Sequence, residues 1–274
     1  MARRLIVVLA ALVLLAGCAT KPISTADAST ATGENTFAEV DYDNDPLELL
    51  NRFTFSFNWA LDVIIFKPAA ATYRFLLPEA VRDSIRNALR NLRTPVILAN
   101  DLLQGKTDRA EVTAVRFVIN STVGVLGLFD AAEDMGYPYH DEDFGQTLAV
   151  HGVGEGAYLV LPVLGPSSFR DGVGILVDTF LDPLTYVAQA NDAEDALVGR
   201  TVTSGIDRRA RNIETLEDLE RDAIDFYARI RSLYRQTRRN EINDGEVLEE
   251  TPVPGLYSLD FDLDFEEDQV GRNQ

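Results

Sequence analysis

The segment from Leu47 to Phe66 constrains the fold more than any other part of the chain. Polar residues recur along it at every third or fourth position: Asn51, Thr54, Asn58 and Asp62. Most of the remaining residues are apolar. This spacing predicts a helix with one narrow polar strip, although the alternation of aromatic and polar residues from Phe53 to Trp59 would by itself favour a strand. Such a helix either is deeply buried or lies against lipid.

Prolines mark where the helices are expected to begin and end. Asp45-Pro46 begins the first helix, Lys67-Pro68 ends it, and Pro78 opens a second helix that Thr94-Pro95 interrupts. The apolar, glycine-spaced segment 121–130 suits either a tight helix contact or a loop pressed against other backbone. Apolar residues at helical spacing predict further helices in three regions: 106–120, 168–180 and 192–240. Because no convincing strand pattern remains, the sequence predicts an all-α fold.

The net charge of −19 on the chain of 274 residues excludes two classes of partner. Nucleic acid binding needs Lys and Arg to displace counterions from the phosphates. Electrostatic docking on an anionic bilayer needs the same side chains, so any contact with a membrane must be apolar. The hydrophobic content of 46% is compatible with one folded domain that carries tails.

Cys18 is the only cysteine, which excludes an intramolecular disulfide and a Cys-rich metal site. It follows a positive Arg3-Arg4 pair, an apolar run from Leu5 to Leu15, and the small residues Ala16-Gly17. This pattern resembles a bacterial lipoprotein signal, in which residues 1–17 are removed and Cys18 is acylated. The alternative is an uncleaved anchor helix, but the apolar run is short for a bilayer span.

The segments that flank the domain are expected to be flexible. Residues 18–44, which begin with the acylated cysteine, are rich in small and acidic residues and predict a tether. Ala19 rather than aspartate follows Cys18, and this resembles the sorting pattern for the periplasmic side of the outer membrane. The folded domain is expected at 45–240. From residue 241 to 274, eleven acidic residues and one base predict an acidic, disordered tail.

Three stretches contain residues that functional sites use, but each lacks part of its template. Gly105-Lys106-Thr107 resembles the end of a phosphate loop, yet Asn100 stands where that loop needs its first glycine. Ser167 lies in a nucleophile-elbow-like sequence without the closing glycine, and we expect it to cap the next helix. The run from His140 to Asp143 predicts a solvated loop or helix cap more than a metal site, because adjacent side chains diverge. The sequence thus predicts no catalytic residue, metal or cofactor.

A glycine-rich segment separates these acids from an apolar run. The spacing of Gly152, Gly154 and Gly156 is wrong for a dinucleotide fingerprint and predicts a turn or hinge. The run from Tyr158 to Leu164 is broken by Pro162 and is too short to cross a bilayer.

Motifs in four stretches of the chain together resemble one family, over roughly residues 45–240. They are Asp45-Pro-Leu-Glu with Asn51-Arg-Phe-x-Phe-Ser-Phe-Asn58; Asn91-Leu-Arg-x-Pro95 with Asn100-Asp-Leu-Leu-Gln-Gly105; Arg116-Phe-x-Ile-Asn-Ser-Thr122 with Gly127-Leu-Phe-Asp130; and His140-Asp-Glu-Asp-Phe-Gly-Gln-Thr-Leu148 with Leu161-Pro-x-Leu-Gly-Pro-Ser167. In this order, the motifs resemble the MlaA (VacJ) outer-membrane lipoproteins.

The resemblance implies a ring-like bundle of helices embedded in the inner leaflet of the outer membrane. In that family a channel takes misplaced phospholipid from the outer leaflet and passes it to a soluble periplasmic carrier, and a trimeric porin usually holds the ring. By this resemblance, seven residues are expected to face lipid or line the channel: Phe53, Phe57, Trp59, Ile64, Tyr158, Leu161 and Leu164.

Two functions from different classes remain open. The first is phospholipid transport that maintains lipid asymmetry of the outer membrane. The second is a non-enzymatic envelope scaffold or adaptor, which would tolerate polar substitutions at Phe53, Phe57 and Ile64. An envelope hydrolase is a distant third, because the chain has only two histidines, His140 and His151, to serve as a base.

Overall fold

The computed structural model describes residues 45–245. The expected signal peptide, Cys18, the tether up to residue 44 and the acidic tail from residue 246 lie outside the described residues. Helices make up most of the described part, and this confirms the expected fold class. Their bounds are α2 Glu48–Leu61, the π-helix η2 Asp62–Phe66, α3 Lys67–Leu76, α4 Glu79–Leu103, α5 Thr107–Thr122, α6 Ala131–Asp134, α7 Phe144–Val150, α8 Phe169–Leu181, α9 Pro183–Ala190, α10 Glu194–Arg211, α11 Ile213–Asp222 and α12 Phe226–Ile242.

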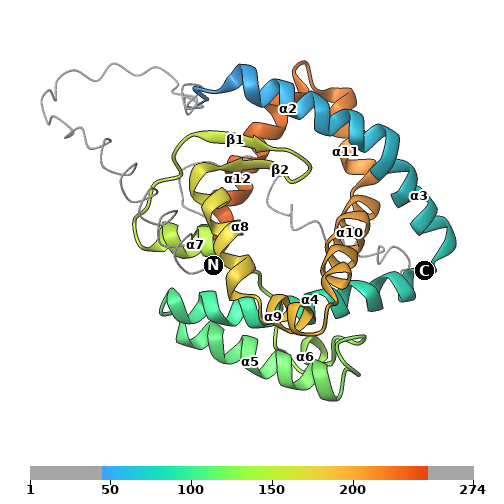
Figure 1. Cartoon of the computed structure of the whole chain (residues 1–274), viewed down its shortest axis with the longest axis vertical. Helices are drawn as coiled ribbons and strands as arrows, with labels where there is room; N and C mark the ends of the chain where they lie inside the picture. The colour runs from blue at the N-terminus through green and yellow to red at the C-terminus, as the bar shows by residue number, and fades with distance from the viewer. Residues whose placement is uncertain (1–44, 246–274) are drawn as a thin grey trace, which may run out of the picture. The chain divides into compact units, whose positions relative to one another are not determined.

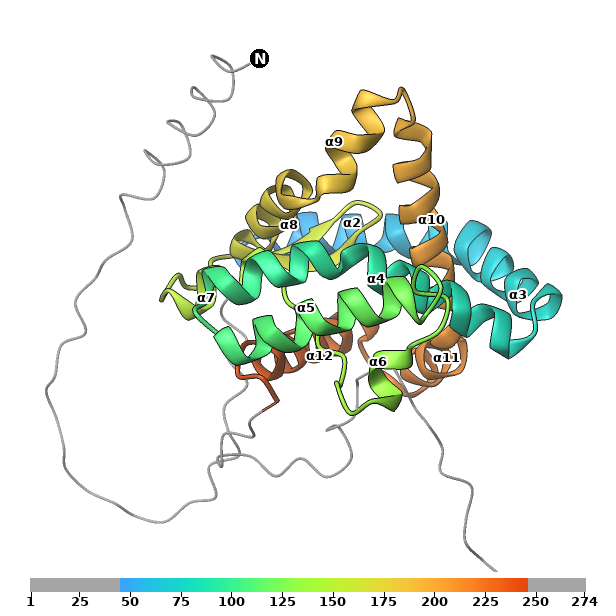
Figure 2. The ribbon, with the colours of Figure 1, turned by 90° about the horizontal axis from the view of Figure 1, so that it is seen from below.

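Within residues 45–245 the helices follow one another around a ring (Figure 1). From α2 the chain runs through η2 and α3 into α4, and α10 returns later in the sequence to contact both α3 and α4. Helices α4 and α5 pack side by side as a hairpin. Figure 2 shows α9 and α10 rising on one side of this hairpin, with α11 and α12 on the other side.

The segment Tyr158 to Ser168 forms a two-stranded antiparallel hairpin, which the sequence did not predict. Strand β1 covers Tyr158–Leu161 and strand β2 covers Gly165–Ser168, with Tyr158 opposite Ser168. The run was interpreted as an apolar passage because only four residues form each strand, too few to show an alternating pattern. Val163 and Gly165 in the turn have φ values of 67° and 88°. The hairpin packs between α2, which contacts β1, and α12, which contacts β2.

Two prolines that were expected to break helices do not break them. Thr94-Pro95 lies inside α4, where its neighbours Val96 and Ile97 are buried, so packing outweighs the missing backbone donor of Pro95. Lys67-Pro68 lies at the start of α3, directly after η2. In η2 the Lys67 N–H already donates to the carbonyl five residues back, on Asp62, so the regular ladder is shifted where Pro68 lacks its donor.

Of two further expectations from the sequence, the structure differs from one and confirms the other. The region 192–240 was expected to be one long helical region, but it is divided into α10, α11 and α12, with breaks at Asn212 and Ala223. The close backbone contact expected at 121–130 is confirmed. A Cβ added to Gly124 would lie 2.3 Å from the carbonyl oxygen of Phe129, and one added to Gly127 would lie 2.4 Å from the Asn91 Cβ.

Candidate functional site

Helix α2 has the opposite polarity to a helix of a water-soluble domain. Asn51 and Thr54, which belong to the polar strip of the sequence, are only 1% and 9% exposed. Phe53 on the same helix is 74% exposed. The strip therefore faces the protein and the apolar residues face outwards, which is the arrangement expected of a helix surrounded by acyl chains.

Exposed apolar side chains continue from α2 through η2 into α3. We call this set the apolar belt: Leu49, Leu50, Phe53, Phe57, Val63, Ile64, Ile65, Phe75 and Leu76. Monomeric water-soluble proteins rarely expose a large continuous apolar surface, and such surfaces mark membrane or protein contacts. In the described chain from Ile213 onwards, Ile224 is the one large apolar side chain that is exposed. The surface formed by α11 and α12 therefore suits water.

An ion pair with two hydrogen bonds anchors the π-helix η2 to α10, the helix that packs beside α3 (Figure 1). Arg209 on α10 donates from Nε and Nη2 to the two carboxylate oxygens of Asp62, at 2.7 and 2.9 Å. The Arg209 side chain is almost buried. Because Asp62 is thus held against α10, the next three residues, Val63 to Ile65, all remain exposed in the apolar belt.

Two asparagines of α2 hold the outer edge of strand β1. The Asn51 amide donates to the Tyr158 carbonyl at 3.0 Å and accepts from the Val160 N–H at 2.9 Å. The Asn58 amide donates to the Leu161 carbonyl at 2.9 Å and accepts from the Val163 N–H at 2.8 Å. We call these four bonds the asparagine clamp. They satisfy backbone groups that the edge of a two-stranded sheet would otherwise leave unpaired.

The residues expected to face lipid do not all lie on the surface. Phe53, Phe57, Ile64 and Leu164 are exposed, and Leu161 is half-buried. Trp59 is half-buried and packs edge-on against Phe226, with 5.5 Å between ring centroids. Tyr158 is 2% exposed in a core cluster with Val160 and Tyr227, so the expectation that Tyr158 contacts lipid or lines a channel is wrong.

The three glycines before the hairpin are exposed. Gly152 and Gly156 have φ values of 84° and 70°, which favour glycine and suit the predicted turn. A Cβ at Gly156 would also approach the Phe169 Cβ to 3.1 Å, whereas a Cβ at Gly154 would meet open space. Whether these residues act as a hinge stays a prediction.

The stretch from His140 to Asp143 is less solvated than expected. Asp143 caps α7 by accepting from the Gln146 N–H at 2.9 Å, as the helix-cap interpretation predicts. Glu142, however, is fully buried, and Arg109 and Lys106 pair with it at 3.0 and 3.4 Å. Lys106, considered for a phosphate loop, is thus held by carboxylates. Sequence position alone could not show which of these acids points inwards.

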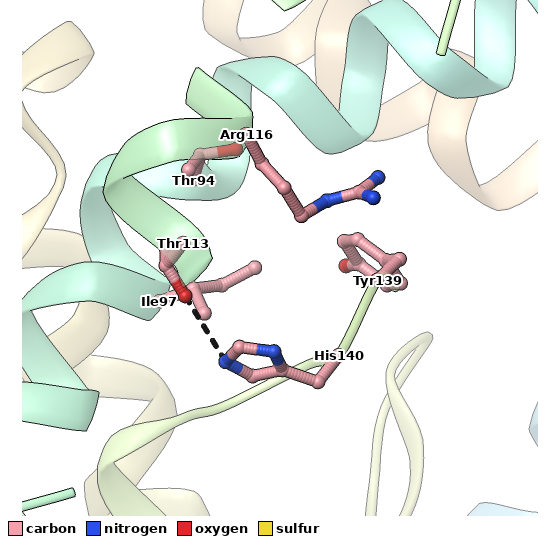
Figure 3. Close-up of a pocket in the computed structure, with 6 residues that line it drawn as sticks. All are labelled: Thr94, Ile97, Thr113, Arg116, Tyr139 and His140. Carbon is pink, nitrogen blue, oxygen red and sulfur yellow. Dashed lines mark hydrogen bonds between the residues drawn. The ribbon is translucent and has the colours of Figure 1, made fainter. Parts of the chain in front are cut away.

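His140 does not have the geometry of a catalytic base. Its Nε2 lies 3.1 Å from an oxygen of buried Asp101 and 3.0 Å from the Thr113 hydroxyl (Figure 3). In a catalytic triad the acid and the nucleophile contact different ring nitrogens. The adjacent cavity, lined also by Arg116 and Tyr139, has a volume of about 10 Å³, which is space for one water molecule and not for a lipid.

Ser167 is buried and does not cap α8, contrary to expectation. Instead Ser168, the next residue, is the N-cap and accepts from the Asp171 N–H at 3.1 Å. Cap positions are uncertain by one residue when they are predicted from sequence, because adjacent serines are equally suited to the role.

A buried charge network joins α12 to α7 and α8, and sequence reasoning missed it. Arg238 donates to Asp143 at 2.7 and 2.8 Å and to Asp171 at 3.0 Å. Burial alone would raise the pKa of Asp171, but Arg238 and the Tyr234 hydroxyl lower it to about 2. Burial would likewise raise the pKa of Asp143, and Arg238 keeps it below its usual value.

A family model described as MlaA lipoprotein matches residues 43–241. The chain belongs to the MlaA lipoprotein family. It is 32% identical over 225 residues to a protein of Escherichia coli named intermembrane phospholipid transport system lipoprotein MlaA, a match that covers 80% of this chain and 86% of that protein. It is 33% identical over 239 residues to the Haemophilus influenzae protein of the same name, covering 84% and 94% of the two chains.

A solved structure of the MlaA fold agrees with the ring of helices described above. The structure, reported as "Structural basis for maintenance of bacterial outer membrane lipid asymmetry", superposes with a TM-score of 0.64 and 33% sequence identity. The match covers 73% of this chain and 99% of that chain. Among residues 45–245, no helix has the length and apolar content needed to cross a membrane.

Proposed function

We propose that this protein moves phospholipids from the outer leaflet of the outer membrane towards a periplasmic carrier, and so maintains lipid asymmetry. The membership of the MlaA family and the likeness to a structure that concerns outer-membrane lipid asymmetry support this function. In this proposal the acylated Cys18 anchors the chain on the periplasmic side, a trimeric porin holds the ring, and a soluble carrier receives the lipid. The protein performs no covalent chemistry.

The reversed polarity of α2 carries the proposal. A helix that buries Asn51 and exposes Phe53 is stable only where its outer face is not in water, because each exposed large apolar side chain favours an apolar environment by about 1.5–3 kcal/mol. The apolar belt extends this face through η2 and α3. No single helix spans the bilayer in the described chain, so the belt suits immersion in one leaflet.

The polar surface on the other side fits delivery to a water-soluble partner. Helices α11 and α12 lie on the side of the α4–α5 hairpin opposite α9 and α10 (Figure 2), and their exposed side chains are mainly charged. With the belt in lipid, this side would meet the periplasm. Lipid that passes the ring would then leave next to a surface that a soluble carrier can approach.

Cells that lack their own copy of the gene provide the test of transport. A membrane-impermeant amine reagent labels phosphatidylethanolamine in the outer leaflet, and the wild-type gene should lower this labelling to the level of the parent strain. A belt variant with F53Q, I64Q and F75Q should fail to do so at equal protein level. The matched control I224Q, an apolar-to-polar change outside the belt, should behave as wild type.

The outcomes separate transport from a scaffold. If the wild-type gene does not lower outer-leaflet labelling, the transport function is wrong. If the wild-type gene lowers the labelling and the belt variant does so equally well, the belt is not a lipid contact. A photo-crosslinker at Phe53 or Leu164 should in addition capture labelled phospholipid, and one at Ile224 should not.

A further inference from the structure

The asparagine clamp holds one face of helix α2 against strand β1 and the turn that follows it. Asn51 and Asn58 are seven residues apart, so they lie on one face of α2 and are separated by about 10.5 Å along its axis. The backbone groups that Asn51 binds flank Leu159 within β1, and those that Asn58 binds flank Pro162, where β1 passes into the turn. Helix α2 thus pairs with the edge of β1 at one point and with the start of the turn at the other.

Asn51 differs from Asn58 because its amide has a third partner, Asp45, in addition to the two backbone groups of the hairpin. One hydrogen of the Asn51 amide points to the Tyr158 carbonyl, and the second donates to the Asp45 carboxylate at 2.7 Å. The amide oxygen accepts from the Val160 N–H. An amide that was turned over would place its NH₂ group against the Val160 N–H and its oxygen against the Tyr158 carbonyl and the Asp45 carboxylate, so Asp45 reinforces the one orientation that the strand accepts.

Asp45 is itself held by helix α12. Its second oxygen accepts from the Tyr227 hydroxyl and from Arg231 Nη1, the latter at 2.8 Å. The carboxylate is 2% exposed and the Arg231 side chain 10% exposed. A buried carboxylate must keep such partners, so Asp45 is fixed at the junction of α2, β1 and α12.

We propose that Asp45 is a positioning residue, which holds the Asn51 amide in place against β1 and thereby keeps the β1–β2 hairpin in the position that lipid passage requires. The hairpin turn carries exposed Val163 and Leu164, so the clamp determines where these apolar side chains lie. The part of this inference that concerns lipid passage rests on the proposed function. The part that concerns the hairpin does not.

Amide hydrogen exchange in detergent micelles tests the hairpin part site by site. In D45N the Val160 N–H should exchange at least about tenfold faster than in the wild type, while the Val163 N–H, held by Asn58, should change less than about threefold. N58A should give the reverse pattern. The matched control N191A removes an asparagine whose amide donates only to the nearby Val187 carbonyl, and it should leave both amides unchanged.

A double variant separates positioning from a general loss of stability. Because Asp45 acts through Asn51, D45N combined with N51L should expose the Val160 N–H no more than N51L alone. If Asp45 and Asn51 contributed independently, the increases in the Val160 exchange rate would instead multiply in the double variant. Unchanged Val160 exchange in D45N, or multiplied effects in the double variant, would overturn the proposal. Y227F, which removes one partner of Asp45 and leaves the bond to Asn51, should keep Val160 within about threefold of wild type, and a larger change would also count against it.

Outer-leaflet labelling then tests the link to transport. D45N and N51L should raise the labelling at least about threefold at equal protein level, and N191A should not. Faster Val160 exchange in D45N with normal labelling would retain the clamp and overturn its role in lipid passage. A wild-type protein that fails to lower the labelling would refute the proposed function and leave the exchange result valid.

Discussion

Helices α2 and α12 both pack against the β1–β2 hairpin, and their surfaces have opposite polarity. Helix α2 contacts β1, buries Asn51 and exposes Phe53. Helix α12 contacts β2, buries Tyr227 and Leu233 and exposes charged Arg239. One hairpin thus contacts both a helix whose exposed face suits lipid and a helix whose exposed face suits water. Under the proposed function, the boundary between membrane and periplasm would run close to this hairpin.

Aromatic and polar contacts join the two helices. Phe226 contacts the rings of Phe55 and Trp59, each with 5.5 Å between centroids. Tyr227 and Arg231 bind Asp45, just before α2. The two environments therefore meet across a packed interface, and changes on one side can be compared with matched changes on the other.

The largest effect is expected where α12 buries charge. R238A removes the cation that half-buried Asp143 and buried Asp171 share, and leaves Asp171 with Arg170 and the Tyr234 hydroxyl, so we expect a loss of about 3 kcal/mol in the free energy of unfolding. Urea denaturation in detergent micelles measures this loss. R239A, on the exposed face of the same helix, is the control and should change the stability by less than about 0.5 kcal/mol. Equal effects would show that α12 has no distinct buried face.

The apolar belt should respond in the opposite way. F53Q and I64Q should each weaken membrane association by about 2 kcal/mol, because each removes one large apolar side chain from lipid. Unfolding in detergent should change little, since neither side chain packs in the protein core. Flotation of the protein without its lipid anchor on vesicles measures the association, with I224Q as control. A loss of folding stability as large as the loss of association would contradict the lipid-facing assignment.

The pH dependence of stability should distinguish Asp178 from Asp143 and Asp171, the two carboxylates that bind Arg238 of α12. Burial raises the pKa of Asp178 to about 6, although the Asn100 amide and the Phe144 N–H lower it. The folded protein therefore binds the proton more tightly than the unfolded chain, and this stabilisation is lost as the pH rises from about 4 through 6. Relative to the wild type, D178N should gain about 2 kcal/mol between pH 4.5 and 7, measured by denaturation at each pH. A constant difference would show that Asp178 is ionised throughout this range.

The smallest effect is expected from the exposed ion pair between the two helices. Arg52 donates to Asp225, the N-cap of α12, at 2.6 Å, and both side chains are largely solvated. R52Q should lower the stability by less than about 1 kcal/mol, and the difference should disappear in 1 M salt. D225A should cost more than R52Q because it also removes the helix cap. A larger loss of stability in R52Q than in D225A would mean that the ion pair contributes more to stability than the helix cap.

The sequence predicts the elements of this molecule better than their orientation. The periodicity of Asn51, Thr54 and Asn58 identified both a helix and its polar strip, because it depends only on the helical repeat. It could not show that the strip faces inwards, since the same pattern is produced by a helix in either solvent. The proline boundary at Pro95 was wrong because tertiary packing outweighed a local preference, and the one at Pro68 was wrong because the π-helix before it shifts the backbone hydrogen bonds.

The candidate site was predicted less completely than the fold. The exposed positions Phe53 and Ile64 follow from the helical pattern and the family resemblance. The burial of Tyr158 depends on its pairing in the hairpin and its contact with Tyr227, residues far apart in the sequence. The partners of Arg238 are likewise set by long-range contacts, and a single sequence contains no signal for them.

The bonds that close the ring have a consequence for how the protein is made. Asp62 binds Arg209, which is 147 positions later in the chain, and Tyr73 binds Asp207, which is 134 positions later. During synthesis the segment from α2 to α3 therefore emerges long before α10 is available, so its polar side lacks partners and its apolar side lacks lipid. Contacts of such long range form late in folding. The unfinished chain must accordingly be shielded from aggregation until its second half has been made, and variants that weaken ring closure should lower the yield of the protein before they alter its behaviour in the membrane.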